Sequence, residues 1–273
     1  MGLNNINLLG TLTLNNFHHS GEMGDIIYSL PVVRALGGGN FYISNEYSGM
    51  HLNTRFDQNL FDNVKEILEP LPYINDVCFD FPHGEFIDLN VFRKGYEDWI
   101  AGKLTDDQAV LIRTTNIISL HKQHFNIGNV SSSPWLFANK KPIENKPIII
   151  NRTHRYNNYK FPWKQIIQRF GDKCGFVGFE GEHKSFCNDI SPVDHVKTDT
   201  FKDLIETING SKVFIGNQSF CYSLCQGLKK YSILETDSYM NNCRYKRCGN
   251  LVDSTDIDTI IFYIKKKLDK HGL

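Results

Sequence analysis

The stretch that decides the fold is residues 147–179, PIIINRTHRYNNYKFPWKQIIQRFGDKCGFVGF. Three isoleucines at 148–150 form a short apolar run, which is typical of a fully buried strand. Residues 162–170 predict a helix, because proline suits the first helical turn and Gly171 follows the last apolar residue. The pattern of a strand returns at 176–179. Strand, helix and strand in this order are typical of two parallel strands joined by a crossover helix.

The same alternation continues toward the C-terminus. The spacing of apolar residues predicts further helices over 200–208, 219–228 and 256–267, and further strands over 213–215 and 231–234. An alternation of this length predicts a parallel sheet that is covered by helices on both faces. In such sheets, ligands bind at the carboxyl ends of the strands.

The first half begins in a similar way. An apolar stretch at 6–14 predicts a strand, and a polar, glycine-containing turn follows at 17–25. The next apolar residues have helical spacing, and three glycines at 37–39 end this helix. Pro31 within it predicts either a kink or the true first turn. Residues 41–44 predict the next strand, so the first half also contains a βαβ unit.

The segment 141–147, KPIENKP, is polar and holds two prolines, which is the composition of a linker. We therefore expect an N-terminal domain over 1–140 and a C-terminal domain over 148–255, each a Rossmann-like α/β unit. Residues 256–273 form a terminal helix beyond the second domain.

The composition is that of an ordinary globular protein. Of 273 residues, 41% are hydrophobic and 22% charged, and the 19 Phe and 12 Tyr exclude an intrinsically disordered chain. No apolar run approaches the roughly 18 residues of a membrane span, so we expect no integral membrane segment. The N-terminus lacks the basic and apolar regions of a signal peptide, and the seven cysteines are an odd number. We therefore expect a cytoplasmic protein with reduced thiols.

The charges are unevenly distributed, although the net charge is zero. Residues 1–146 carry 11 basic and 16 acidic side chains, a net charge of −5, whereas residues 147–273 carry 19 and 14, a net charge of +5. The overall balance gives no general attraction to nucleic acid. The small basic excess of the second half predicts a small bound anion.

Two charged clusters follow predicted strands. Gly24 and Asp25 lie where a helix begins, and Asp25 there is either an N-cap or a general base at the edge of the sheet. After the strand at 148–150, a loop carries two arginines and a lysine within nine residues. Such a loop is either a solvated basic surface or a site for phosphate oxygens, which arginine binds through two hydrogen bonds.

Two further polar clusters lie at predicted strand ends. Residues 215–219, Ile-Gly-Asn-Gln-Ser, either cap the following helix or present its N–H groups to an anion. Glu182 follows the strand at 176–179, where a carboxylate could hold ribose hydroxyls. The sequence has no GxxxxGK[ST] or GxGxxG motif, which removes the main support for an ATPase or a nicotinamide-dependent dehydrogenase.

No metal site is expected. The pairs Cys221/Cys225 and Cys243/Cys248 have spacings that could supply half of a zinc site. However, the first pair lies in an apolar helical pattern, which is more typical of buried thiols. The D-x-D sequence at 256–258 opens a helix, where acidic side chains complement the dipole.

These clusters, in this order, resemble the glycosyltransferase family of bacterial heptosyltransferases (glycosyltransferase family 9), which has the GT-B fold. The resemblance covers residues 20–37 and 148–235, under half of the chain. It is carried by Gly24-Asp25-Ile26-Ile27 with Leu30-Pro31, by Lys160-Phe161-Pro162-Trp163, by Gly178 through Glu182, and by Ile215-Gly216-Asn217-Gln218-Ser219.

The resemblance implies two facing Rossmann-like domains with the active site in the cleft between them. It implies a donor on the second domain, an acceptor on the first, and a terminal helix that crosses back to the first domain. The activity it implies is metal-independent, inverting transfer of a sugar from a nucleotide-diphosphate sugar to an acceptor hydroxyl of a glycan or lipopolysaccharide-like molecule. No cofactor beyond this co-substrate is implied.

The resemblance also implies roles for individual residues. Asp25 would be the catalytic base, and Gly24 and His19 would lie on the acceptor side. The donor would be bound by Arg152, Arg155, Lys160, Glu182, Asn217, Gln218 and Ser219.

The sequence departs from the family at three positions. Gln218 stands where the family has Asp, Phe220 where it has Gly, and Ser223 where it has His. Because of these changes, the resemblance does not specify which sugar the donor carries. They also favour one alternative, a nucleotide-sugar-binding protein without catalysis, against which Asp25 argues. A second alternative is a phage-type glycosyltransferase that acts on a hydroxylated base in DNA, against which the acidic first half argues.

Overall fold

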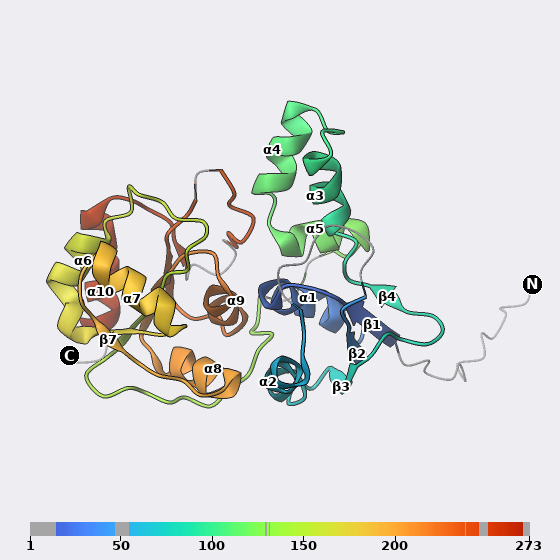
Figure 1. Cartoon of the computed structure of the whole chain (residues 1–273), viewed down its shortest axis with the longest axis horizontal. Helices are drawn as coiled ribbons and strands as arrows, with labels where there is room; N and C mark the ends of the chain where they lie inside the picture. The colour runs from blue at the N-terminus through green and yellow to red at the C-terminus, as the bar shows by residue number, and fades with distance from the viewer. Residues whose placement is uncertain are drawn as a thin grey trace, which may run out of the picture.

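The computed structural model describes residues 15–46, 55–128, 130, 132–237, 239–245 and 251–269. The strand predicted at 6–14 and Cys248 lie outside these ranges. The described residues form two parallel sheets flanked by helices (Figure 1). This confirms the predicted α/β class with two Rossmann-like units. We call residues 15–124 the first lobe and residues 148–269 the second lobe.

The sheet of the first lobe has the strand order β3-β2-β1-β4, and all its strands are parallel. Its elements are β1 Asn15–His19, α1 Met23–Ala35, β2 Gly39–Ile43, α2 Gln58–Leu68, β3 Ile74–Phe79 and β4 Ile87–Asp88. Residues 17–19, predicted to lie in a turn, belong to β1, because β2 on one side and β4 on the other pair with them.

The helix α1 begins earlier than the position of its proline suggested. Pro31 lies inside the helix, so it does not mark the first turn. Glu22 is the N-cap, and Asp25 lies in the first turn rather than at the cap. After α1, Gly38 has a φ of 75°, and a Cβ there would overlap the carbonyl of Tyr73. Only glycine therefore fits this turn into β2.

Three short helices follow β4, in a region whose apolar pattern is mixed. They are α3 Arg93–Ile100, α4 Asp106–Thr114 and α5 Ile117–His124. A capping box between Thr105 and Gln108 starts α4, and the side chain of Asn116 caps α5. The helix α5 packs against α1, which places this group of helices beside the end of α1 (Figure 1).

The sheet of the second lobe has the order β10-β9-β8-β5-β6-β7, again parallel. Its elements are β5 Ile148–Asn151, α6 Trp163–Phe170, β6 Cys174–Phe176, α7 Glu180–Asp189, β7 Asp194–His195, α8 Phe201–Gly210, β8 Val213–Gly216, α9 Phe220–Gly227, β9 Ser232–Leu234, β10 Leu251–Val252 and α10 Ile257–Asp269. The predicted alternation is confirmed. One strand differs from the prediction: β6 ends at Phe176, whereas a strand was expected over 176–179. Glu182 lies in the helix α7.

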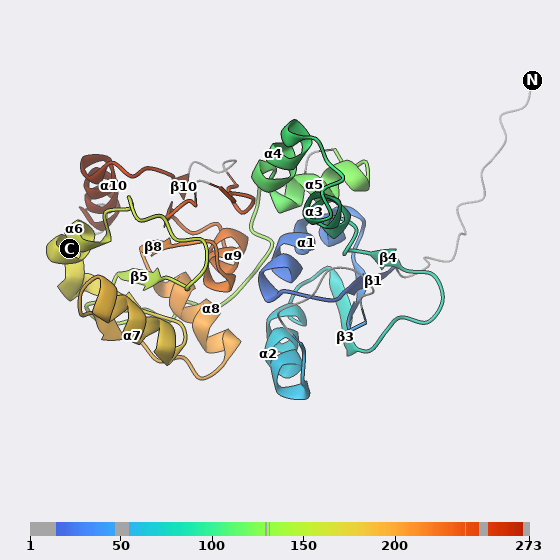
Figure 2. The same cartoon turned by 45° about the horizontal axis from the view of Figure 1, so that its top comes forward.

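The two lobes pack directly on each other. The helix α1 lies against α9, and α2 lies against α8, as both views show (Figures 1 and 2). One hydrophobic core continues through this contact and includes Leu30 of the first lobe and Leu224 of the second. The segment between the lobes contributes the buried Trp135. Its backbone N–H donates to the carbonyl of Gly227 at 3.0 Å, and its backbone carbonyl accepts from the Tyr73 hydroxyl. The lobes are therefore held in one arrangement by apolar burial.

The terminal helix α10 stays on the second lobe, which corrects the expectation that it crosses back. Its apolar stripe, Ile260, Ile264 and Leu268, is buried in the core of that lobe. The segment 239–245 makes the connection instead. Asn242 donates from Nδ2 to the Tyr96 hydroxyl at 2.6 Å, and its carbonyl accepts from the N–H of Ile117 at 3.0 Å. None of the helices in the described ranges is both long and apolar enough to span a membrane.

Candidate functional site

The strand order gives each sheet a topological switch point. In the first sheet the chain proceeds from β1 to β2 and β3 on one side and to β4 on the other; in the second sheet β5 separates β6 and β7 from β8, β9 and β10. Loops at both points are joined by hydrogen bonds, from the N–H of Ser20 to Asn90 at 3.0 Å and from the Ser219 hydroxyl to Asn151 at 2.8 Å. Open parallel sheets bind ligands at such points.

Both switch points open onto one cavity of about 490 Å³ between the lobes. The first lobe contributes the first turn of α1 and one face of α3 to its wall. The second lobe contributes Arg155 and Tyr156, the N-terminus of α9 and the segment 240–243. This volume lies in the ordinary range of small-molecule sites, roughly 300–1,000 Å³.

Asp25 lies in the wall of this cavity and is paired with Arg93. The Nη2 atom of Arg93 lies 2.7 Å from Oδ2 of Asp25, and the two side chains are 4% and 20% exposed. Burial raises the pKa of Asp25 to about 6, with a further upward effect from Glu22, against the lowering effect of Arg93 and Arg155. A carboxylate with a pKa near neutrality, at the edge of a cavity, is suited to accept a proton from a bound ligand.

This pKa predicts how activity depends on pH. A carboxyl group accepts a proton only when it is ionised, so a raised pKa moves the loss of activity to higher pH. We expect kcat/KM to fall about tenfold per pH unit below about pH 6 and to be level above it. A pH–rate profile measures this. A fall that begins only near pH 4, the range of an exposed carboxyl, would contradict the assignment of Asp25.

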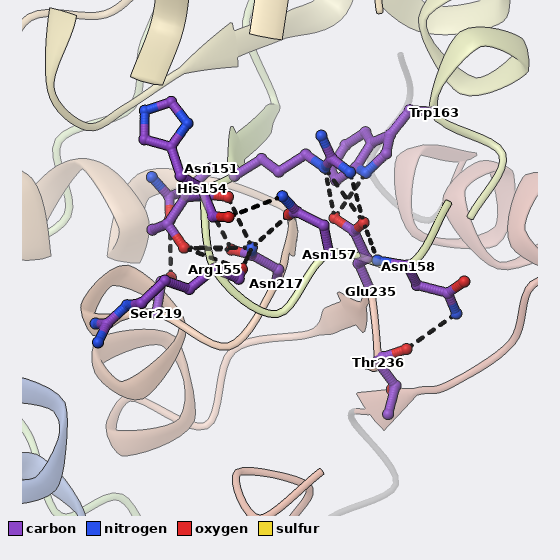
Figure 3. A network of polar contacts seen from close by, with 12 residues as sticks. Asn151, His154, Arg155, Asn157, Asn158, Trp163, Asn217, Ser219, Glu235 and Thr236 are labelled. Carbon is purple, nitrogen blue, oxygen red and sulfur yellow. Dashed lines mark hydrogen bonds and ion pairs between the residues drawn. The ribbon is translucent and has the colours of Figure 1, made fainter. Parts of the chain in front are cut away.

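The loop after β5 is held in place by two buried side chains (Figure 3). Asn217 donates from Nδ2 to the carbonyls of Thr153 at 3.1 Å and Arg155 at 2.6 Å, and its Oδ1 accepts from the N–H of Thr153 at 3.1 Å. Asn217 is fully buried. It therefore shapes the loop from behind rather than contacting a ligand in the cavity.

Arg152 pairs with Glu235 and does not belong to the cavity wall. Its Nε lies 2.9 Å from Oε2 of Glu235, which is fully buried and also accepts from the indole N–H of Trp163 and the N–H of Asn158, both at 2.8 Å. Arg152 is not in the cavity wall, so the structure does not place it as the expected donor contact. A buried carboxylate requires a cation beside it, and this requirement decides where Arg152 points.

Arg155 and Tyr156 are the residues of this loop that reach the cavity. Arg155 is exposed, and its guanidinium carbon lies 5.7 Å from the centre of the Tyr156 ring. Tyr156 has a φ of 57°, a left-handed conformation that is uncommon outside glycine. The bonds of Asn217 to the neighbouring residues hold this conformation. Of the loop cations, Arg155 thus faces the same space as Asp25.

The N-terminus of α9 forms the adjacent wall. Ser219 is its N-cap, with Oγ accepting from the N–H of Tyr222 at 3.2 Å. Gln218 lines the cavity and donates to Asn242 at 3.3 Å. Its Oε1 is buried and has no hydrogen-bond partner among the described residues. An acceptor in this position can bind a hydroxyl of a ligand. Gln218 and Ser219 both lie in the cavity wall, and their role in donor binding stays a prediction.

The remaining predicted residues lie around the cavity or outside it. Gly24 lies in its wall. His19 is fully buried behind the wall, and burial holds its pKa well below the ordinary value, so the ring is neutral. Glu182 accepts from the N–H of Phe179 at 3.1 Å at the start of α7, and Lys160 is exposed away from the cavity. Thus His19, Glu182 and Lys160 do not line the cavity, although Phe179, beside Glu182, does.

The sequence analysis missed Arg93 and the aromatic face of α3. Both lie in a region for which the sequence analysis predicted no elements. A usable signal was present, because Phe92, Tyr96, Trp99 and Ile100 repeat at helical spacing, with Arg93 beside the first. Nothing in the local sequence, however, pairs Arg93 with Asp25, 68 residues away.

Three of the described residues considered for metal binding are Cys225, Cys243 and Asp256. Burial raises the pKa of Cys225 and of Cys243 to about 12, so these thiols are protonated. Asp256 caps α10 by accepting from the N–H of Thr259 at 2.8 Å. Within the described ranges, no three His, Cys, Asp or Glu side chains are grouped so that they could hold a metal ion.

Comparison with known proteins finds similar structures only. No family model and no curated protein sequence matches the chain. The heptosyltransferase TibC, an iron-containing dodecamer in complex with ADP-D-β-D-heptose, matches with a TM-score of 0.56 at 12% identity, over 97% of this chain and 81% of its own. A glycosyl transferase of family 9 from Veillonella parvula matches with a TM-score of 0.54 at 11% identity, over 94% and 89%.

A Listeria monocytogenes protein proposed to be a UDP-N-acetylglucosamine 2-epimerase also matches, with a TM-score of 0.50 at 10% identity, over 94% of this chain and 89% of its own. At such identities the likeness concerns the fold, and different reactions can share a fold. The resemblance inferred from the sequence motifs is confirmed at this level. The chain has the two-lobed GT-B architecture of family 9 glycosyltransferases.

Proposed function

We propose that this protein is a glycosyltransferase that moves a sugar from a nucleotide-diphosphate sugar to an acceptor hydroxyl. The observation that carries the proposal is the cavity itself. Asp25 from the first lobe, with its raised pKa, faces Arg155 and the N-terminus of α9 from the second lobe. A base on one side and positive charge on the other are what a displacement at a sugar carbon requires.

In the proposed reaction, the ionised carboxylate of Asp25 accepts the proton of the acceptor hydroxyl. The oxygen forms a bond to the anomeric carbon, and the bond from that carbon to the diphosphate breaks, with its electron pair leaving on the phosphate oxygen. Attack from the side opposite the leaving group inverts the configuration. Arg93, bonded to Asp25 at 2.7 Å, keeps the carboxylate oriented toward the cavity.

The negative charge that develops on the leaving diphosphate would be stabilised by Arg155 and by the N–H groups at the start of α9. We propose that these groups act without a divalent metal ion and that no other cofactor takes part. Glu182, at the start of α7, is our candidate for the ribose hydroxyls. Ligands of the structural neighbours support a nucleotide-sugar donor, since TibC was captured with ADP-D-β-D-heptose.

The test is a variant of Arg155. Arg155→Ala should weaken binding of ADP or UDP at least about tenfold, because a charge-assisted contact to phosphate is lost. Calorimetric titration measures the affinity, and transfer is assayed in parallel with and without EDTA.

Lys160→Ala is the matched control, since Lys160 belongs to the same loop but not to the cavity wall. Equal nucleotide affinity in wild type and Arg155→Ala, or activity that EDTA abolishes and Mg²⁺ restores, would contradict the proposed charge stabilisation.

A further inference from the structure

Phe179 is an aromatic residue that the second lobe leaves exposed at the cavity. It belongs to the cavity wall, and 72% of it is exposed. It is also the N-cap of α7, a position that Ser, Thr, Asp and Asn favour because their side chains accept from the first N–H groups of a helix. A phenylalanine side chain cannot do this. Neither burial in a core nor capping of α7 therefore accounts for a ring at this position.

The backbone that carries this ring is held on both sides. Gly178 has a φ of 128°, and a Cβ there would lie 2.7 Å from Nδ2 of Asn151 and from Oε2 of Glu182, so only glycine fits. The N–H of Phe179 donates to Oε2 of Glu182 at 3.1 Å, and its carbonyl accepts from the N–H of His183 at 3.0 Å. Because the backbone is already ordered, a ligand that contacts the ring removes little backbone entropy.

The order of the strands places Phe179 next to Arg155. In the sheet of the second lobe, β5 lies between β8 and β6. Arg155 follows β5, the N-terminus of α9 follows β8, and Phe179 follows β6. The carboxyl ends of parallel strands share one edge of a sheet, where ligands bind. Along this edge the order is therefore the start of α9, Arg155 and Phe179, and all three contribute to the cavity wall.

Electrostatic effects agree with this order. Burial raises the pKa of Asp25 and of Glu182, and Arg155 is among the groups that lower both. Arg155 is thus within electrostatic reach of Asp25 and also of Glu182, which is bonded to Phe179. In the proposed function the diphosphate lies at Arg155, with the sugar on the side of Asp25. The nucleoside then extends to the other side, toward Glu182 and Phe179.

We propose that the ring of Phe179 is the surface on which the nucleobase of the donor stacks. Every base has a π-face, so an aromatic side chain binds it without reading its hydrogen-bonding edge. The carboxylate of Glu182 beside the ring favours a nucleoside, with its ribose hydroxyls, over a lipid chain as the group that the ring binds. The proposal rests on the proposed function and adds where the nucleoside lies. The donor is then a nucleotide sugar rather than a lipid-linked diphosphate sugar.

The experiment compares ligands that share a diphosphate and differ in the base. Calorimetric titration measures the affinity of ADP, UDP and inorganic pyrophosphate, of which only the first two carry a base. Phe179→Ala should weaken binding of the tighter nucleotide about tenfold, because stacking is lost, and should leave that of pyrophosphate within about twofold of wild type. Phe179→Tyr should retain most of the nucleotide affinity, since the ring is kept. Arg155→Ala, in contrast, should weaken binding of all three ligands.

Phe262→Ala is the matched control, because Phe262 is an exposed aromatic residue of α10 outside the cavity wall. It should leave the affinity of all three ligands unchanged. Saturation-transfer NMR supplies a second measurement that a merely structural role of Phe179 would not affect. The base protons of the bound nucleotide should receive strong saturation in the wild type and much less in Phe179→Ala. Thermal unfolding without ligand should be equal in the two proteins, since the ring is exposed.

The outcomes separate this inference from the proposed function. If neither ADP nor UDP binds the wild type, the proposed function is wrong and the inference falls with it. If a nucleotide binds and Phe179→Ala leaves its affinity unchanged, as it would if the ring served a lipid chain, the inference is overturned while the diphosphate site stands. Pyrophosphate that is weakened as much as the nucleotide by Phe179→Ala, or that binds the wild type as tightly as both nucleotides, would overturn it as well.

Discussion

Replacing Asp25 with asparagine is expected to lower the turnover of sugar transfer by at least about 10²-fold, because an amide cannot accept the proton of the attacking hydroxyl. Asparagine has nearly the shape of aspartate and keeps an oxygen for Arg93. Affinity for the nucleotide should therefore change little. A fall in kcat with unchanged nucleotide affinity identifies a group that acts in the transition state.

The matched control is Asp98→Asn. Asp98 lies on α3 near the cavity, where it pairs with Lys94 and Lys103 outside the wall, and its loss should leave turnover unchanged. Turnover and nucleotide titrations are measured for both variants, with thermal unfolding to confirm that each is folded. Turnover of Asp25→Asn close to wild type would remove the base assignment. Nucleotide binding without turnover in the wild type would favour the alternative of a binding protein that lacks catalysis.

Replacing Arg152 with methionine is expected to lower the free energy of unfolding by about 3–5 kcal/mol, since it leaves the fully buried Glu235 without its cation. Urea denaturation measures the change. The double variant Arg152→Met with Glu235→Gln should recover more than half of the loss, because the unpaired charge is gone while an oxygen remains for the indole N–H of Trp163.

Lys160→Met serves as the control for a basic residue of the same loop. Lys160 is exposed, so this change should lie within about 0.5 kcal/mol of wild type. If Arg152→Met were as stable as the control, Arg152 would not be required by Glu235, and its expected role at the donor would have to be considered again.

The second lobe was largely predictable, because its signals are local. The apolar run at 148–150 becomes the fully buried strand β5. Thr200 and Ser219 act as N-caps of α8 and α9 through their own side chains. Each of these features depends on residues within one turn or strand, so the chain specifies them without reference to the rest of the molecule.

Two arginines of the loop after β5, by contrast, point in different directions because of residues in other segments of the chain. The sequence does not distinguish Arg152 from Arg155. In the structure, Arg152 pairs with Glu235 outside the cavity wall, whereas Asn217 holds the backbone carbonyl of Arg155, which lines the cavity. The two partners follow other strands of the sheet: Asn217 follows β8, the neighbour of β5, and Glu235 follows β9. The loop composition predicted a cationic site but could not say which cation would form it.

By itself, then, the sequence determined the α/β class, the alternation of the second lobe, the strand-end clusters and the resemblance to family 9 glycosyltransferases. Only the tertiary structure decided that Asp25 pairs with Arg93, that Arg155 faces it and that α3 supplies an aromatic face to the cavity. The physical reason is the distance along the chain between the interacting residues. Caps and apolar periods act between residues a few positions apart, whereas the pKa of a carboxyl and the direction of a buried arginine depend on charges and burial that distant segments contribute.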